Sequence, residues 1–374
     1  MKTWPILGIL VIQALLLLAH WFIYFTWVVF WWPMSTPTVL ALRTSIFLLA
    51  FSFMTAALLG FYYTNWLVRL LYRLAAVWLG LLNFFFFAAC LCWLASLALM
   101  LPGLRFVGIT VNRPLLAVAL FGLALLAGVY GMVNARFIRI RRISNKLPGL
   151  PESWRGRAAL VASDLHLGHI NGPSFSRHIV KLAARLQPEI IFFPGDFFDG
   201  GKSDAATLAE PFRALAPPLG SYFSTGNHDE FGNANYYGEV LTSVGIHVLV
   251  NEKVTVDGLQ IVGIPNGDSG SPIRLRATLG SLSLVPGRAS ILLNHTPNRL
   301  PIVEQAGISL QISGHTHGGQ ILPFTWFTRR AFGKFTYGLQ RFGKLQVYTS
   351  SGAGTWGPPM RVGTCPEIVL LTFE

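Results

Sequence analysis

Residues 158–166 read AALVASDLH, an apolar run of five residues that leads through Ser163 into Asp164 and His166. The run has the length and composition of a buried strand. Asp164 and His166 are two positions apart, so on an extended loop both side chains can point the same way. Ligands of α/β sheets bind beyond the carboxyl ends of strands. The stretch therefore predicts an α/β fold with a site at that edge of the sheet.

Four further apolar runs end in polar clusters, with helical patterns between the runs. They lead into GDFFD (195–199), GNHD (226–229), NH (294–295) and GHTH (314–317). Glycines before Asp196, Asn227 and His315 are expected to let the backbone turn sharply. Asp, Asn and His donors without thiolates suit Mn²⁺, Fe, Zn²⁺ or Mg²⁺. The set is large enough for two ions, which can clamp a transferring phosphoryl group.

In this order the five clusters resemble the motifs of the calcineurin-like metallophosphoesterases, over about residues 155–374. The resemblance implies a four-layer α/β sandwich of two β-sheets flanked by helices. We expect two divalent metal ions, with Mn²⁺ preferred over Fe, Zn²⁺ or Mg²⁺. The first ion would be held by Asp164, His166, Asp196 and His317, and the second by Asp196, Asn227, His295 and His315. Asp196 would then bridge the two ions.

Three further residues are candidates for the chemistry. The resemblance implies that His228 faces the substrate phosphate, where it could stabilise charge and donate a proton to the leaving oxygen. Asp229 is adjacent and could fix the tautomer of His228. Asp199 could support a metal ligand, or it could instead be a helix N-cap. The basic residues Arg329, Arg330, Lys334, Arg341, Lys344 and Arg361 are either substrate contacts or part of an exposed basic loop.

The first 150 residues predict a different kind of structure. They hold eleven Lys and Arg and no acidic residue, whereas the remainder holds eighteen basic and sixteen acidic residues. Four apolar runs, at about 6–30, 44–63, 74–101 and 114–133, are each long enough to span a bilayer. We therefore predict an anchor of four transmembrane helices at 1–143. A linker at 144–157, rich in Pro and Gly, and a catalytic domain at 158–374 would follow.

Charge also bears on localisation and partners. Lys and Arg gather on one side of the predicted spans, which favours a cytoplasmic N-terminus and catalytic domain. The basic stretch 136–142 is either a topology signal or a strip that binds anionic lipid. The C-terminal part is nearly neutral, so no nucleic acid is expected as a partner. Three cysteines make neither a disulfide framework nor a thiolate zinc site.

The GHTHGGQ motif (314–320) and the later PEI (366–368) are most similar to the membrane-attached bacterial branch of the family. Some members of that branch resemble UDP-2,3-diacylglucosamine pyrophosphohydrolases of lipid A biosynthesis. We therefore expect an inner-membrane enzyme that hydrolyses a phosphodiester or pyrophosphate bond of a lipid-linked substrate. Membrane lipid would be its partner. The alternatives are a nucleotide or nucleic-acid phosphodiesterase, and a non-enzymatic membrane sensor with a relict metal site.

Overall fold

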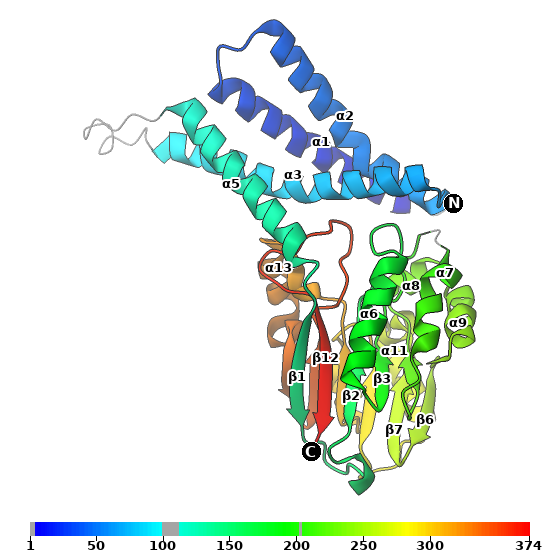
Figure 1. Cartoon of the computed structure of the whole chain (residues 1–374). Helices are drawn as coiled ribbons and strands as arrows, with labels where there is room; N and C mark the ends of the chain where they lie inside the picture. Colours follow the sequence, from blue (N-terminus) through cyan, green and yellow to red (C-terminus); the bar gives the residue numbers. More distant parts are fainter. Residues whose placement is uncertain (1–3, 99–111, 202–203) are drawn as a thin grey trace. The chain divides into compact units, whose positions relative to one another are not determined.

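The computed structural model of the chain describes residues 4–98, 112–201 and 204–374 (Figure 1). These residues form two compact units. The first contains the chain up to Val133 together with Pro358–Met360, and the second contains Asn134–Gly357 and Arg361–Glu374.

Within the described residues, the first unit contains four helices that are long and apolar enough to cross a membrane. They are α1 (Trp4–Phe30), α2 (Thr36–Tyr62), α3 (Trp66–Ala98) and α5 (Arg113–Asn134). Helices at the four predicted runs are thereby confirmed, but α2 and α3 begin eight residues earlier than the predicted runs. The extra turns contain Arg43, Arg69 and Arg73, whose long side chains can reach water from a helix end. Residues 99–101 of the predicted third span lie outside the described residues.

Polar side chains inside the apolar helices bond to neighbouring helices. The indole N–H of Trp78 donates to Nε2 of His20 (2.8 Å), and that of Trp93 donates to the hydroxyl of Thr26 (2.9 Å). The amide of Gln13 donates to the carbonyl of Ala50 (3.0 Å). In a bilayer, such bonds would join helices where no water is present to replace them. They give these polar residues a structural role.

The second unit contains two mixed six-stranded sheets. The first has the order β1-β12-β2-β3-β4-β5, and the second has the order β10-β11-β9-β8-β7-β6. The first sheet comprises β1 (Arg139–Asn145), β2 (Ala158–Val161), β3 (Ile190–Phe193), β4 (Ser221–Phe223), β5 (Ile246–Val248) and β12 (Glu367–Phe373). The second comprises β6 (Glu252–Val256), β7 (Leu259–Gly263), β8 (Ser290–Leu293), β9 (Leu310–Ser313), β10 (Gly338–Phe342) and β11 (Leu345–Thr349).

The pairing within each sheet is parallel at the strands that carry the motifs. Strands β2, β3, β4 and β5 are parallel neighbours, as are β7, β8, β9 and β11. The pairs β12–β2, β6–β7 and β10–β11 are antiparallel, whereas β1 pairs parallel with β12. Parallel neighbours end at the same edge, so their following loops gather there.

Alternate residues of the strands face different cores. In β2, Ala159 and Val161 belong to the core between the two sheets, whereas Leu160 belongs to the core beneath the helices of the first sheet. In β8, Ile291 and Leu293 face the inter-sheet core and Leu292 faces the helices of the second sheet. Because strands buried on both faces carry apolar residues at every position, they read as continuous apolar runs.

Helices complete the two outer layers. Those of the described chain are α6 (Pro173–Leu186), α7 (Ala205–Ala209), α8 (Asn227–Phe231), α9 (Ala234–Ser243), α10 (Asn266–Gly270), α11 (Pro272–Ser281), α12 (Leu300–Gln305) and α13 (Phe324–Phe332). Short 3₁₀ turns are η1 (Glu152–Trp154), η2 (Glu210–Ala214), η3 (His317–Gly319) and η4 (Gly333–Thr336). Residues of α6, α7 and α9 cover the first sheet, and residues of α11 and α12 cover the second. This arrangement confirms the predicted four-layer sandwich.

The second unit begins earlier than the predicted boundary at 158. Residues 139–145, predicted to belong to the anchor and linker, form the edge strand β1, and Arg141 pairs with Glu367 (3.5 Å). Within the predicted linker, Leu147 and Trp154 are buried in the inter-sheet core. The sequence does not indicate this strand, because β1 is polar and its hydrogen-bonding partner β12 lies more than 220 residues away in sequence.

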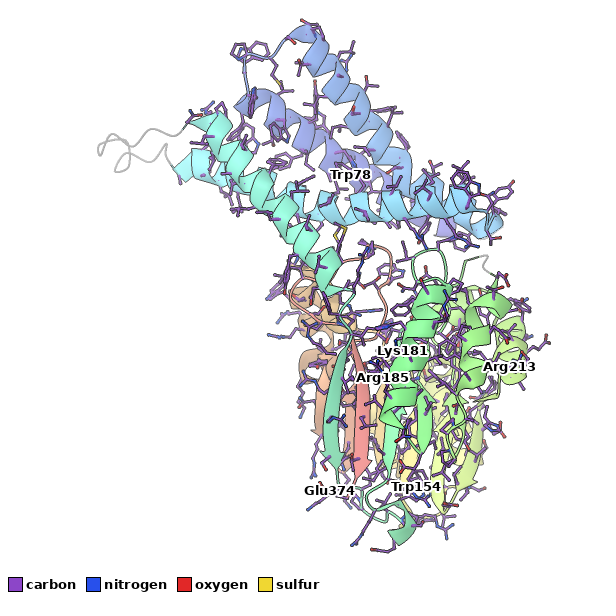
Figure 2. All side chains as sticks on the ribbon, viewed as in Figure 1. Trp78, Trp154, Lys181, Arg185, Arg213 and Glu374 are labelled. Carbon is purple, nitrogen blue, oxygen red and sulfur yellow. The ribbon has the colours of Figure 1, made fainter. Side chains whose placement is uncertain are left out.

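Replacing Trp154 tests whether this segment contributes to the stability of the second unit. It is fully buried, stacks edge-on against Phe373 (5.5 Å) and donates its indole N–H to the carbonyl of Val256 (3.2 Å); Figure 2 shows it at the same end of the unit as Glu374. We expect Trp154→Ala to lower the free energy of unfolding by about 3–5 kcal/mol, because a large cavity is left. Urea titration of the full-length protein in mild detergent measures this. Arg155→Ala, at an exposed ion pair in the same segment, should change it by less than about 1 kcal/mol.

Candidate metal centre

All five motifs lie on loops that follow strands of the two sheets. Asp164 and His166 follow β2, Asp196 and Asp199 follow β3, and Asn227 and His228 open α8 after β4. His295 follows β8, while His315 and His317 follow β9. The first sheet therefore supplies the carboxylates, and the second supplies three of the histidines. The site is assembled only when the two sheets pack together.

The backbone at these loops is unusual. Several residues predicted as ligands adopt a left-handed conformation with positive φ: Asp164 (54°), His166 (45°), Asp196 (51°), His315 (68°) and His317 (48°). A non-glycine residue in this conformation costs about 1–2 kcal/mol. Such strain persists where the surrounding structure enforces it, which is common at functional sites. The fold thus stabilises a backbone path that turns these side chains inward.

The glycines beside the ligands serve two different purposes. Gly195 has φ of 101°, as expected for a sharp turn. Gly226, with φ of −95°, and Gly314 are not in the left-handed region. Instead, a Cβ atom at Gly226 would overlap Asp196, and one at Gly314 would overlap Ser163 and Asp164. For these two, the expected sharp turn is replaced by a close approach of loops.

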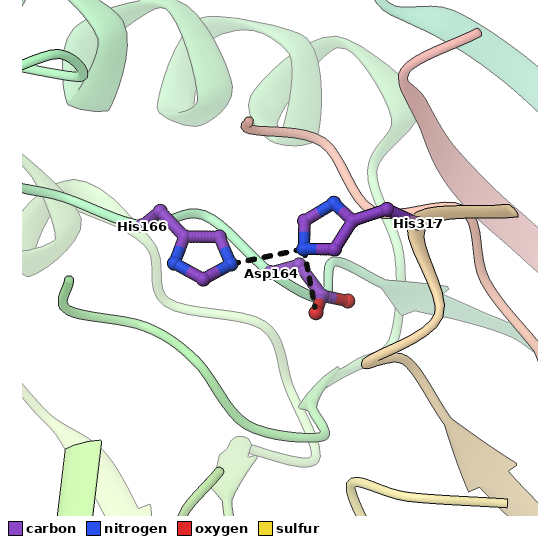
Figure 3. Close-up of side chains that lie close together, drawn as sticks. All are labelled: Asp164, His166 and His317. Carbon is purple, nitrogen blue, oxygen red and sulfur yellow. Dashed lines mark hydrogen bonds and ion pairs between the residues drawn. The ribbon is translucent and has the colours of Figure 1, made fainter. Parts of the chain in front are cut away.

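Asp164, His166 and His317 form one potential metal-binding group (Figure 3). The Nε2 atoms of His166 and His317 face each other at 3.0 Å, and Nε2 of His317 lies 3.5 Å from Oδ1 of Asp164. Two nitrogens each bound at about 2.1 Å and separated by this distance subtend about 90° at a shared ion. The spacing therefore fits two neighbouring ligands of one cation.

Asp196 lies at the centre of the site. Its Oδ2 is 3.6 Å from Nε2 of His166 and 3.1 Å from Nε2 of His295. Its Oδ1 accepts the backbone N–H of His228 (2.8 Å). One carboxylate oxygen thus lies between imidazoles from the two sheets. This is the position required of a bridging ligand.

The ring of His295 is oriented for coordination through Nε2. Its Nδ1 lies 2.9 Å from the carbonyl of Pro194. A carbonyl only accepts, so Nδ1 carries a proton, and loss of the second proton to a bound cation would leave the lone pair at Nε2. Nε2 itself is buried and faces Oδ2 of Asp196. Asp164, Asp196 and His295 form a second group of potential ligands.

Asn227 and His315 lie together. The Nδ1–H of His315 donates to Oδ1 of Asn227 (2.9 Å), and the backbone N–H of His315 donates to Oδ1 of Asp164 (2.9 Å). The ring of His315 also packs edge-on against that of His295 (5.2 Å). The structure therefore brings both residues beside the second group, although His315 is not a member of any of the close groups of potential ligands in the described chain.

The buried charges of the site fit cations. Asp164 and Asp196 are both buried, and Oδ2 of Asp164 has no hydrogen-bond partner. Burial raises the pKa of Asp164. Burial acts on Asp196 in the same direction, but His295 lowers the pKa of Asp196 below its usual range. Burial disfavours the charged form of His295, yet the Asp196 carboxylate raises the pKa of His295 to about 10. A positive charge beside Asp196 is thus strongly stabilised, which suits divalent ions.

Two other histidines of the site, His315 and His317, are neutral at neutral pH. Burial lowers the pKa of His315 to about 4, and the charge of His295 adds to this effect. Burial also places the pKa of His317 well below its ordinary value. Metals bind the unprotonated imidazole, so His315 can act as a ligand through Nε2 at neutral pH without losing a proton.

Asp199 holds two of the histidines. Its Oδ1 accepts from Nδ1 of His166 (3.1 Å) and lies 3.5 Å from Nδ1 of His228, while its carbonyl accepts from the same Nδ1 (3.2 Å). A carboxylate on the far nitrogen of a ligating His fixes the ring and strengthens its basicity. The predicted alternative of a helix N-cap does not hold, because Asp204 caps α7.

Asp199→Asn is expected to weaken metal binding by about 10–100-fold, the usual effect of losing a carboxylate that supports a ligating histidine. The chain should remain folded, because Asn preserves the shape of the side chain. Isothermal titration of the metal-depleted protein with Mn²⁺ measures the affinity. Asp204→Asn, at an exposed helix cap, should leave it unchanged. Equal affinities for all three proteins would contradict the assignment of Asp199.

The structure gives Asp229 a different role from the predicted one. Its carboxylate accepts backbone N–H groups of Gly226 (2.8 Å), Phe198 (2.9 Å) and Phe197 (3.4 Å). It thus ties the loop after β4 to the loop after β3. Asp199, rather than the adjacent Asp229, contacts Nδ1 of His228. Burial raises the pKa of Asp229 to about 7.

Arg361 is one of the basic residues interpreted as substrate contacts or as part of an exposed basic loop, but it is fully buried and fits neither interpretation. Its guanidinium donates to the carbonyls of Gly354 (2.6 Å), Gly352 (3.2 Å) and His317 (3.2 Å), and Nη2 lies 3.2 Å from Nδ1 of His317. Arg361 therefore positions His317 and its loop. Its sequence neighbours could not reveal this, because His317 lies 44 residues earlier in the chain.

Comparison with known proteins agrees with this geometry. The family model described as calcineurin-like phosphoesterase matches residues 159–319. A transmembrane protein with metallophosphoesterase domain from Danio rerio is 31% identical over 330 residues, covering 83% of this chain and 74% of the relative. That match is longer than the second unit, so it extends into the apolar helices.

Two bacterial relatives are uncharacterized metallophosphoesterases. One, from Aquifex aeolicus, is 28% identical over 258 residues, which cover 67% of this chain and 98% of the relative. The other, from Campylobacter jejuni, is 28% identical over 254 residues, which cover 66% of each chain. The motif order, the sandwich fold, the convergent ligand atoms and these matches together show that the chain belongs to the family of calcineurin-like phosphoesterases.

Proposed function

We propose that this chain is a membrane-embedded, dinuclear metal-dependent enzyme that hydrolyses a phosphodiester or pyrophosphate bond of a lipid-linked substrate. The observation that carries the proposal is the position of Asp196, whose Oδ2 lies between Nε2 of His166 and Nε2 of His295. The proposed ligands of the first ion are Asp164, His166, Asp196 and His317, and those of the second are Asp196, Asn227, His295 and His315. The proposed ion is Mn²⁺.

The chemistry needs little from the protein beyond positioning and charge. Two divalent ions, when bound, polarise phosphoryl oxygens and activate water near neutral pH. His228 is held with its Nδ1 proton on the carbonyl of Asp199, so Nε2 is available to the substrate. Burial lowers the pKa of His228, and the nearby His166 lowers it further. A lowered pKa makes the imidazolium a stronger proton donor, as protonation of a leaving oxygen requires.

The membrane anchor supports a lipid-linked substrate. Four spanning helices hold the second unit at a bilayer, where a lipid-linked phosphoester is concentrated and a soluble nucleotide is not. UDP-2,3-diacylglucosamine of lipid A biosynthesis is one molecule of this class. The positive-inside distribution supports an inner-membrane protein with its catalytic unit in the cytoplasm. The nearly neutral composition after residue 150 offers little attraction for a long polyanion.

The test uses full-length protein in detergent micelles with Mn²⁺. Turnover of a chromogenic phosphate bis-ester, lost with a chelator and restored by Mn²⁺, is the expected result. UDP-diacylglucosamine and other lipid-linked pyrophosphates are then compared with soluble nucleotides. Faster cleavage of soluble nucleotides than of any lipid would reject the lipid-linked substrate. Bound metal without turnover of any of these compounds would favour the membrane-sensor alternative.

A further inference from the structure

Helix α13 carries an exposed aromatic cluster. Phe324, Trp326 and Phe327 are 54%, 63% and 54% exposed. The ring of Phe327 lies 6.2 Å from that of Phe324 and 5.0 Å from that of Trp326, so the three side chains form one cluster. No residue of α13 is buried. Large apolar side chains gathered on a protein surface usually mark a site that another molecule covers.

The surroundings of this aromatic cluster are cationic. Arg329 and Arg330 lie in the last turn of α13, Lys334 follows, and all three are exposed. Residues 305–366 contain no Asp or Glu. Aromatic residues beside Lys and Arg, without acids, are the composition of a surface that binds anionic lipid. A second copy of the chain would instead bring like charges together at this face.

The segment 361–364 forms hydrogen bonds both with the end of α5 and with the residues just before α13. Helix α5 has 22 residues, so it is about 33 Å long, close to the hydrocarbon thickness of a bilayer. Its last residue, Asn134, therefore belongs near the lipid boundary. The side-chain amide of Asn134 donates to the carbonyls of Arg361 (2.9 Å) and Thr364 (2.8 Å).

The same short segment carries α13. The backbone N–H of Leu322, two residues before α13, donates to the carbonyl of Val362 (3.0 Å), and the N–H of Val362 donates to the carbonyl of Gln320 (3.0 Å). Within the second unit, α13 lies at the end of the first sheet where β1 begins (Figure 1). Hydrogen bonds from the segment 361–364 thus connect Asn134, at the end of α5, with the residues just before α13.

We propose that Phe324, Trp326 and Phe327 lie in the headgroup region of the bilayer that the chain's own helices cross, with Arg329, Arg330 and Lys334 facing anionic lipid phosphates. Helix α13 begins seven residues after His317, so this contact would hold the metal centre at the membrane surface. The inference goes beyond the proposed function, because lipid contact by α13 requires no hydrolysis.

The test measures the depth of a fluorescent label. Full-length protein carrying Phe324→Cys is labelled with a nitrobenzoxadiazole maleimide and reconstituted into vesicles of phosphatidylcholine and phosphatidylglycerol. Wild-type protein treated in the same way corrects for labelling of the native cysteines. The control carries Ile273→Cys on α11, a position that is 82% exposed. Lipids bearing a nitroxide near the headgroup or at the end of an acyl chain are then added.

We expect the headgroup-proximal nitroxide to lower the emission of the label at Phe324→Cys by about twofold or more, and the deep nitroxide to lower it less, as an interfacial helix requires. Neither nitroxide should change the emission of the label at the Ile273→Cys control. Adding Trp326→Ser and Phe327→Ser should reduce the quenching, and Arg329→Gln with Arg330→Gln should weaken its dependence on phosphatidylglycerol. Equal quenching at both label positions would overturn the proposal. The proposal would also be overturned if the label at Phe324→Cys were shielded from aqueous iodide but not quenched by the nitroxide lipids, because a protein partner would then cover α13.

Discussion

Asp196→Ala is expected to lower kcat/KM for phosphoester hydrolysis by at least about 10³-fold, because it removes a carboxylate shared by both proposed metal ions and with it several kcal/mol of charge stabilisation. Bound metal should fall as well. The structure supports the size of this effect, since Asp196 is buried and lies within 3.1 Å of His295. Its removal leaves His295 without the carboxylate that it faces.

The measurement pairs steady-state kinetics with elemental analysis of the full-length protein. Asp257→Ala is the matched control, because Asp257 is a half-exposed carboxylate whose ion pair with Arg157 lies away from the motifs. It should leave kcat/KM and metal content unchanged. An Asp196→Ala protein that keeps both ions and hydrolyses substrate at the normal rate would refute the central position of Asp196.

The second large effect is expected at His228, and it differs from the first in kind. His228→Ala should lower kcat by about 10²–10⁴-fold, the usual contribution of a positioned acid or base. Metal content should stay near that of the wild type, because the role proposed for His228 is toward the substrate. The ring lies beside His166 (4.7 Å between centroids) and retains some exposure, as a group facing a substrate must.

The pH profile separates catalysis from structure. If His228 donates a proton, the alkaline limb of the wild-type profile reports its deprotonation, and that limb should disappear in His228→Ala. His178→Ala, at an exposed position of α6, is the control and should keep the wild-type profile. Loss of one metal ion from His228→Ala would instead make His228 a ligand, a role that its proximity to His166 and Asp196 also permits.

The four apolar helices and the motif-bearing strands could be predicted because their signals are local. An apolar run of about 20 residues indicates a span wherever it occurs. A strand buried on both faces, such as β2 or β3, is apolar at every position, and its ligands follow it directly. Parallel strands end at a common edge, so Asp164 and Asp196, which follow neighbouring strands of one sheet, are expected to lie close together. His317 follows a strand of the other sheet, and only the family resemblance groups it with them.

Edge strand β1 had no such signal. Its sequence RIRRISN is polar and follows a spanning helix, so it suggested a topology signal or a lipid-binding strip. Its strand structure depends on hydrogen bonds to β12, which the chain reaches only near its end. Pairing of this kind is a property of two distant segments and leaves no periodic pattern in either one.

The sequence by itself determined the two-part organisation and the motif-bearing strands, because adjacency along the chain carries that information. The sandwich fold and the set of side chains at the site followed from the resemblance of the motifs to a known family. Only the tertiary structure decided how those side chains act on one another. It showed that Asp199 rather than Asp229 holds His228, that Arg361 positions His317, and that Gly226 and Gly314 are needed for close packing. The physical reason is that hydrogen bonds and steric fit at this site join loops from both sheets, and their distances exist only after the sheets have packed.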